Sequence, residues 1–150
     1  MKKRFTLLAL VLVLVMALAA CGGGNGGEAP VAEGEVALRI TGNVGTEMAW
    51  SEAQVRALET IEVDYTNRDG EPTTYTGVAV NTLLAQAGVS GASSVTFVAA
   101  DDYTAKVALD ELQACADCIV AFVDGGGFRS VLPGFASNVQ VRDLVEIRVQ

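Results

Sequence analysis

Apolar and polar residues alternate in short stretches along most of the chain beyond residue 35. This period-two pattern, typical of strands with one buried face, occurs over 36–41, 61–66, 95–99 and 103–109. Residues 118–123 are instead apolar throughout, which predicts a strand covered on both faces. Because short helices interrupt these strands without a regular strand–helix–strand rhythm, the pattern favours a single small α+β domain with a mixed, mostly antiparallel sheet.

Two segments carry helical patterns. Within 80–87, apolar residues fall at i, i+3, i+4 and i+7, which is one face of a helix, and Gly88 follows where a left-handed C-cap is expected. Residues 51–58 begin with Ser51 as the expected N-cap and Gln54 as its capping-box partner. We therefore expect two short helices, each with a recognisable terminus.

Glycine-rich and polar segments mark the connections between strands. The segment 68–71 reads Arg-Asp-Gly-Glu and predicts a turn. The segment 124–127 contains three consecutive glycines and predicts a hairpin loop that leads into a strand at 128–132. Three glycines also permit close approach of a ligand, so this second role stays open.

The first residues of the chain have the character of a targeting segment. Lys2, Lys3 and Arg4 precede an apolar run that is slightly too short for a transmembrane span, and small residues lead to Cys21. This is the pattern of a bacterial lipoprotein signal, which predicts that 1–20 is a signal peptide and that Cys21 receives a diacylglycerol. An ordinary secretory signal and an uncleaved anchor are the alternatives.

Residues 21–35 are rich in glycine and predict a flexible tether. The remainder, 36–150, is long enough for one hydrophobic core. Together with the lipid anchor, this organisation predicts an extracytoplasmic domain held at the cell membrane or the outer envelope. The membrane is then its first partner, and an unknown small ligand or envelope protein its second.

The formal charge of the chain is −8, and loss of the signal peptide makes it still more negative. An acidic domain is repelled by phosphate backbones, so nucleic acid is excluded as an expected partner. The chain also contains no histidine. This removes the commonest general base, the usual zinc ligand and the serine–histidine or cysteine–histidine nucleophile pairs. No catalytic residue is predicted.

Cys115 and Cys118 enclose the one reactive-looking motif. They close a segment, 110–116, that allows a turn of helix, whereas a redox CxxC of the thioredoxin type usually opens a helix. Outside the cytoplasm two neighbouring cysteines tend to oxidise, so we predict a small structural disulfide. Free buried thiols and a redox role are the alternatives, and two cysteines alone are too few for a structural zinc site.

A second polar cluster, Asp101-Asp102-Tyr103, follows the strand predicted at 95–99. Neighbouring carboxylates in an extended segment point to opposite faces, so they do not form a metal-binding pair by themselves. A turn in which an Asp side chain bonds the backbone is the expected arrangement. No metal ligand is predicted.

Several of these segments together resemble the oxidoreductase molybdopterin-binding domain, with the sulfite-oxidase-like fold, in its short bacterial form. The segments that carry the resemblance are Tyr75-x-Gly77-Val78, Leu83-Leu84-x-x-Ala87-Gly88, Ala100-Asp101-x-Tyr103, Gly127–Pro133 and Val141–Val149. In two places the chain departs from the family pattern. It has Asp-Asp-Tyr where the family commonly has Asp-Gly-Tyr, and its Gly127–Pro133 segment is one residue short.

The resemblance implies a molybdopterin cofactor, but also a thiolate ligand that this chain lacks. Members that bind molybdenum hold it through a cysteine placed after a strand like Ile61–Tyr65, and the segment 64–68 here contains no thiol. In the resembled fold the cofactor lies near the end of this strand, so the resemblance implies a binding face there. Its candidate residues are Asn67, Arg68, Asp101, Tyr103 and Arg129. The sequence therefore predicts a non-catalytic binding or docking module. A molybdopterin-dependent oxidoreductase or redox subunit is the alternative.

Overall fold

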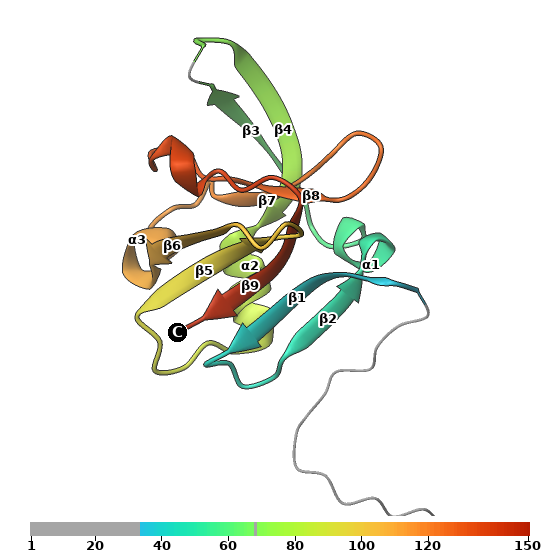
Figure 1. Ribbon diagram of the computed structural model, residues 1–150, viewed down its shortest axis with the longest axis vertical. Helices are drawn as coiled ribbons and strands as arrows, with labels where there is room; N and C mark the ends of the chain where they lie inside the picture. Colours follow the sequence, from blue (N-terminus) through green and yellow to red (C-terminus); the bar gives the residue numbers. More distant parts are fainter. Residues whose placement is uncertain (1–33, 68) are drawn as a thin grey trace, which may run out of the picture.

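The computed structural model describes residues 34–67 and 69–150 (Figure 1). The predicted signal peptide, the lipidation candidate Cys21, most of the predicted tether and Arg68 lie outside these residues. The elements of the described part follow in this order: β1 (Val36–Gly42), β2 (Met48–Ser51), α1 (Glu52–Arg56), β3 (Ile61–Thr66), β4 (Pro72–Ala79), α2 (Val80–Ala87), β5 (Ser94–Ala99), β6 (Thr104–Ala108), α3 (Leu109–Gln113), β7 (Ile119–Phe122), β8 (Phe128–Val131), the 3-10 turn η1 (Ser137–Val139) and β9 (Leu144–Val149).

The strands form two sheets. One has five strands in the order β2-β1-β9-β5-β6, and the other has four in the order β3-β4-β7-β8. Within the described residues β1 and β9 pair in parallel and the other neighbours pair antiparallel. The predicted α+β class with mixed, mostly antiparallel pairing is confirmed, although the strands divide between two sheets.

The main hydrophobic core is centred on the five-stranded sheet. All six residues of β5 are buried, so this strand is covered on both faces, whereas the sequence pattern predicted burial on one face. Fully buried side chains of β1, β5 and β9 gather here: Leu38, Ile40, Phe97, Leu144 and Ile147. The centre of this sheet is therefore fully buried.

The helix α2 places its predicted apolar face on this core. Its buried residues are Val80, Leu83, Leu84 and Ala87. Gly88 has a φ of 68° and donates its N–H to the last carbonyls of the helix, which is the expected left-handed C-cap. The helices in residues 34–67 and 69–150 are short, and none of them is long and apolar enough to cross a membrane.

The N-terminus of α1 has the predicted capping box. The amide of Gln54 donates to the Ser51 hydroxyl at 3.4 Å, and the Gln54 side chain accepts from the Ser51 amide at 2.9 Å. The helix ends at Arg56, slightly earlier than predicted. The strand β2, which leads directly into it, was not predicted, because its four residues are too few to display an alternating pattern.

The hairpin β3–β4 projects away from the rest of the fold (Figure 1). β4 pairs with β3 from Pro72 to Gly77 but with β7 only from Gly77 to Ala79. The outer part of β4 therefore extends beyond the end of β7. Gly77 stands at the junction, where its Cα lies so close to β7 that a Cβ atom would overlap the backbone of Val120.

The closing strand begins later than the sequence suggested. The segment 141–149 resembles a closing strand, but β9 starts at Leu144. Asp143 has a φ of 48°, which interrupts extended backbone just before the strand. Its carbonyl accepts a hydrogen bond from the Ala100 amide at 2.8 Å, so this bend joins the start of β9 to the corner after β5.

Candidate functional site

A cleft of about 400 Å³ lies beside the outer end of β3, β8 and the segment around η1. We call it the η1 cleft. Its lining residues are mostly polar: Tyr65, Asn67, Asp69, Arg129, Ser137, Asn138, Gln140 and Arg142. Two arginines line it in a chain whose formal charge is −8. The cleft is therefore a place where an anionic group would find positive charge on an otherwise acidic protein.

Hydrogen bonds to β8 and to Leu132, which follows it, hold the wall of this cleft in place. The Gln140 side chain accepts from the Leu132 amide and donates to the Leu132 carbonyl, both at 2.8 Å. The buried Ser130 hydroxyl donates to the Val139 carbonyl at 3.0 Å and accepts from the Val141 amide at 2.7 Å. A segment that is neither helix nor strand thereby obtains a fixed position.

Arg129 is the most unusual residue of the cleft. Its guanidinium lies 4.9 Å from the centre of the Tyr75 ring, and its Nη1 donates to the Tyr75 hydroxyl at 3.2 Å. Its Nε is buried without a hydrogen-bond partner, and Arg129 forms no ion pair with the described residues. A buried donor that lacks an acceptor is costly, so the position suits an incoming anion.

Asn67 has a structural task as well as a place in the cleft. Its side-chain oxygen accepts from the amides of Asp69 at 2.9 Å and Glu71 at 3.0 Å. These bonds close the turn between β3 and β4. Of the groups on Asn67, the amide nitrogen is thus the one that offers donors to a ligand.

Tyr103 stands at the margin of the η1 cleft. It is 47% exposed, and its hydroxyl donates to the Asn138 carbonyl at 2.6 Å. Asp101 accepts from the Tyr103 amide at 3.1 Å, which is the expected Asp-bonded turn. Asp102 has a φ of 66°, so the left-handed backbone that suits Gly is kept with Asp in its place.

Of the five predicted face residues, the structure brings two into the η1 cleft and one to its edge. Asn67 and Arg129 line the cleft, Tyr103 touches its wall, Asp101 serves the turn, and Arg68 lies outside the described residues. Among the lining residues that the sequence did not identify are Asn138, Gln140 and Arg142. Of these three, Arg142 alone had a signal in the sequence, as an arginine near the end of an acidic chain.

The cysteine pair lies away from this cleft and is oxidised. Cys115 and Cys118 form a disulfide between the end of α3 and the start of β7, so the motif closes a helix and enters a strand. Cys118 is fully buried. The Asn81 side chain donates to the Cys115 carbonyl at 3.3 Å, and the Val80 amide donates to the Cys118 carbonyl at 2.9 Å. In the described residues no group of three His, Cys, Asp or Glu gathers to hold a metal.

Arg129 also lines a second cleft, of about 450 Å³, which we call the β4 cleft. Its lining residues are Arg56, Thr73, Thr74, Tyr75, Thr76, Phe122, Val123, Asp124 and Arg129. The guanidinium of Arg56 lies 4.5 Å from the centre of the Phe122 ring. The cleft thus contains two arginines, each stacked on an aromatic ring.

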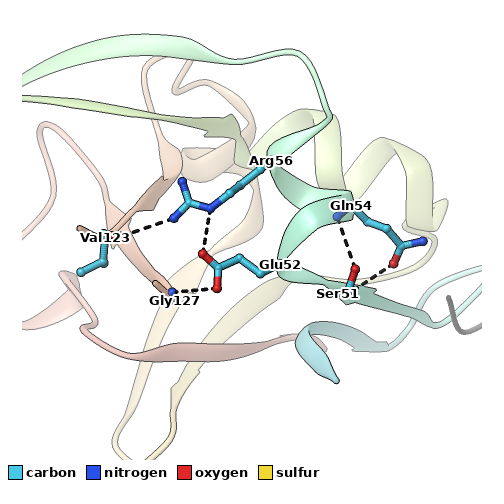
Figure 2. Close-up of polar contacts among 6 residues, drawn as sticks. All are labelled: Ser51, Glu52, Gln54, Arg56, Val123 and Gly127. Carbon is cyan, nitrogen blue, oxygen red and sulfur yellow. Dashed lines mark hydrogen bonds and ion pairs between the residues drawn. The ribbon is translucent and has the colours of Figure 1, made fainter. Parts of the chain in front are cut away.

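Figure 2 shows how α1 is joined to the β7–β8 hairpin beside this cleft. Glu52 accepts from Arg56 Nε at 2.7 Å and from the Gly127 amide at 3.2 Å. Arg56 also donates to the Val123 carbonyl at 3.3 Å. The hydrogen bond from Arg56, followed by that from Gly127, holds the pKa of Glu52 below its ordinary value. The hairpin loop is therefore restrained from both of its ends.

A family model described as the oxidoreductase molybdopterin binding domain matches residues 27–150. The chain belongs to this family. Among solved structures, the sulfane dehydrogenase SoxCD from Paracoccus pantotrophus is similar, with a TM-score of 0.64 and 16% sequence identity. The match covers 75% of this chain and 37% of that one, so the present chain corresponds to little more than a third of its relative. No curated protein matches the chain.

The family binds molybdopterin, and the resemblance implies that a cysteine thiolate holds the molybdenum of that cofactor. The thiols of the described part, Cys115 and Cys118, are joined to one another, and neither offers a thiolate to a metal. The end of β3, where the family resemblance places a cysteine ligand, instead has Tyr65 followed by Thr66. Within residues 34–67 and 69–150, therefore, no cysteine thiolate is available to hold a molybdenum centre.

Proposed function

We propose that this member of the molybdopterin-binding family is a lipid-anchored, extracytoplasmic binding or docking module without molybdenum chemistry. The observation that carries the proposal is the disulfide between Cys115 and Cys118, which leaves the described domain without a thiolate. The absence of histidine removes the other common catalytic routes. A folded domain with a fixed, positively charged cleft then acts by binding.

The η1 cleft is the proposed binding site, and its ligand is anionic. Arg129 has a buried donor without an acceptor and no ion-pair partner in the described residues. Arg142 adds a second cation, and Asn67 adds an amide. A planar guanidinium binds carboxylate, sulfate or phosphate groups through paired hydrogen bonds.

A small anion tests this site directly. Inorganic sulfate and phosphate should each raise the melting temperature of the protein more than chloride does at equal ionic strength, because they bind the folded state. Arg129→Ala should lose the site-specific part of this increment and keep only the general stabilisation that sulfate and phosphate give to folded proteins. Arg148→Ala, which removes an arginine paired with Glu146 elsewhere, should keep the full increment. An equal increment in Arg129→Ala and the wild type would discard the η1 cleft as the site. Arg68→Ala tests the fifth candidate residue in the same way.

The proposed anchor rests on the lipoprotein-like signal that ends at Cys21. Two acyl chains on one cysteine provide stable membrane attachment. Cys21→Ser should therefore move the protein from the membrane fraction to the soluble extracytoplasmic fraction. A variant that stays membrane-bound would show that the apolar segment is itself an uncleaved anchor.

The competing function is a molybdopterin-dependent oxidoreductase or redox subunit. Membership of the family favours it, since the family is named for binding that cofactor. It requires contacts other than a cysteine ligand to hold the metal. The two functions differ in whether the purified protein carries molybdenum or tungsten.

A further inference from the structure

One stretch of β4 is paired on one side only. The strand lies against β3 throughout 72–77, but its pairing with β7 ends at Gly77, opposite Ala121. Beyond that point β7 turns into the hairpin loop, and residues 73–76 of β4 line the β4 cleft. A sheet edge that lines a cleft of about 450 Å³ is a template onto which an extended chain can add as a further strand.

The residues of this open stretch favour strand pairing. Proteins usually guard exposed edges with charged side chains, and β3, at the other side of the hairpin, carries exposed Glu62 and Asp64. The open stretch of β4 instead reads Thr73-Thr74-Tyr75-Thr76, which is uncharged and has high strand propensity. Charged side chains thus protect β3, the outer strand of the hairpin, whereas the open stretch of β4 carries none.

The arginines of the β4 cleft favour an acidic residue in any strand that pairs with β4. Arg56 and Arg129 both line it, each stacked on an aromatic ring. The fork of Arg56 carries five N–H donors, of which Glu52 and the Val123 carbonyl use a part. Glu52 and Gly127 fix the hairpin loop that forms the opposite wall. The cleft is therefore prepared for an acidic side chain beside an extended backbone.

We propose that the β4 cleft docks an extended segment of a partner protein that adds to β4 as a strand and places one carboxylate between Arg56 and Arg129. The inference shares with the proposed function the premise that the domain acts by binding, and it shares Arg129, which lines both clefts. It differs in its site, the β4 cleft, and in its dependence on Arg56, which does not line the η1 cleft.

Three synthetic peptides provide the probe. The first is an acetylated and amidated peptide of alternating valine and threonine with one central glutamate, and the second has lysine in place of glutamate. The third is the glutamate peptide with every second backbone amide N-methylated, which removes the donors needed for strand addition. Each is titrated into the full-length protein while backbone amide shifts are recorded by NMR.

The glutamate peptide should bind and shift the amides of 73–76 and 122–124. The lysine peptide should bind at least about tenfold more weakly, and the N-methylated peptide should show no saturable binding. Arg56→Gln should weaken binding of the glutamate peptide about tenfold. Arg148→Gln is the matched control, because Arg148 also pairs with a glutamate but lies outside the cleft, and it should leave the affinity unchanged.

Failure of the glutamate peptide to bind would overturn the proposal. Equal affinity for the lysine or the N-methylated peptide would also overturn it, as would unchanged binding in Arg56→Gln. These outcomes are separate from those of the proposed function. Molybdenum in the purified protein would refute a non-catalytic role and leave the peptide titration as it is, while loss of peptide binding would leave the sulfate response of Arg129 intact.

Discussion

The two sheets of this domain differ in how completely they are buried. In the five-stranded sheet every residue of β5 is buried and the core includes Phe97 and Ile147. The four-stranded sheet has a smaller outer cluster, formed by Val63, Ile119, Ala121 and Val131 with half-buried tyrosines at its margin. Its hairpin β3–β4 projects into solvent (Figure 1).

This difference in burial suggests that the five-stranded sheet mainly provides stability and that the four-stranded sheet mainly provides the binding surfaces. The η1 cleft and the β4 cleft each contain two arginines, and both border the four-stranded sheet. None of their lining residues comes from β5 or β9. Regions with few buried apolar contacts open more readily than a packed core and can adapt to a ligand. We therefore expect changes in the first sheet to affect mainly folding, and changes at the second sheet to affect mainly binding.

Truncation of the central strand should have the largest effect. Phe97→Ala should lower the free energy of unfolding by about 3–5 kcal/mol, because Phe97 is fully buried and its removal leaves a cavity in the core. Tyr65→Ala, in the half-buried margin of the second sheet, should cost far less. Urea denaturation of both variants measures the contrast. Equal losses would show that the two sheets are not distinguished by packing.

Gly77→Ala tests the joint on which the second sheet depends. An added Cβ would overlap the Val120 carbonyl oxygen and press on Ala121, so β4 and β7 would have to separate. We expect a loss of about 2–3 kcal/mol in urea denaturation, typical of overpacking at a site that relaxes poorly. The amide shifts should change in β4 and β7 and remain constant in β5. A loss below about 0.5 kcal/mol, the usual scale for surface changes, would mean that the joint yields easily.

The disulfide joins the end of α3 to the start of β7, a strand of the four-stranded sheet. Cys115→Ala combined with Cys118→Ala should lower the free energy of unfolding by about 2 kcal/mol, because the closed loop is short and restricts the unfolded chain little. The fold should persist, as judged by the circular dichroism spectrum. Protein exported through its own signal should also resist alkylation until it is reduced, and free thiols there would contradict a disulfide.

The smallest effect concerns acid stability of the first sheet. Partial burial by itself raises the pKa of Glu146, but hydrogen bonds from Thr41 at 2.6 Å and from Arg148 outweigh it and bring that pKa below its ordinary value. A carboxyl whose pKa is lower in the folded state stabilises the fold above its unfolded pKa and loses that contribution as pH falls through the folded value. Thr41→Val should therefore destabilise more at pH 7 than near pH 3. The same loss at both pH values, measured by urea denaturation, would contradict this assignment.

Local features of the fold were predictable because they depend on neighbouring residues. The face of α2, its cap at Gly88 and the capping box of Ser51 and Gln54 require only spacing and side-chain type. The parallel pairing of β1 with β9 joins opposite ends of the chain and leaves no local signal. Full burial of β5 was missed for the same reason, since it depends on what packs on its second face.

The site was predictable in part. Arg129 and Asn67 were identified because they lie in or near family-like segments, and they do share a cleft. Asn138 and Gln140 were missed, because the wall they form is held by hydrogen bonds to Ser130 and Leu132 and has no periodic pattern. The open edge of β4 depends on where β7 ends, which a register between distant strands decides.

The metal content of the purified protein tests the central claim most directly. The full-length chain would be produced in a host that synthesises the pterin cofactor, extracted with its disulfide intact, and analysed for molybdenum and tungsten relative to protein. A domain whose described cysteines are joined to each other should contain far less than one metal per chain. Near-stoichiometric molybdenum or tungsten would contradict the account and make the chain a molybdopterin enzyme that holds its metal without a cysteine.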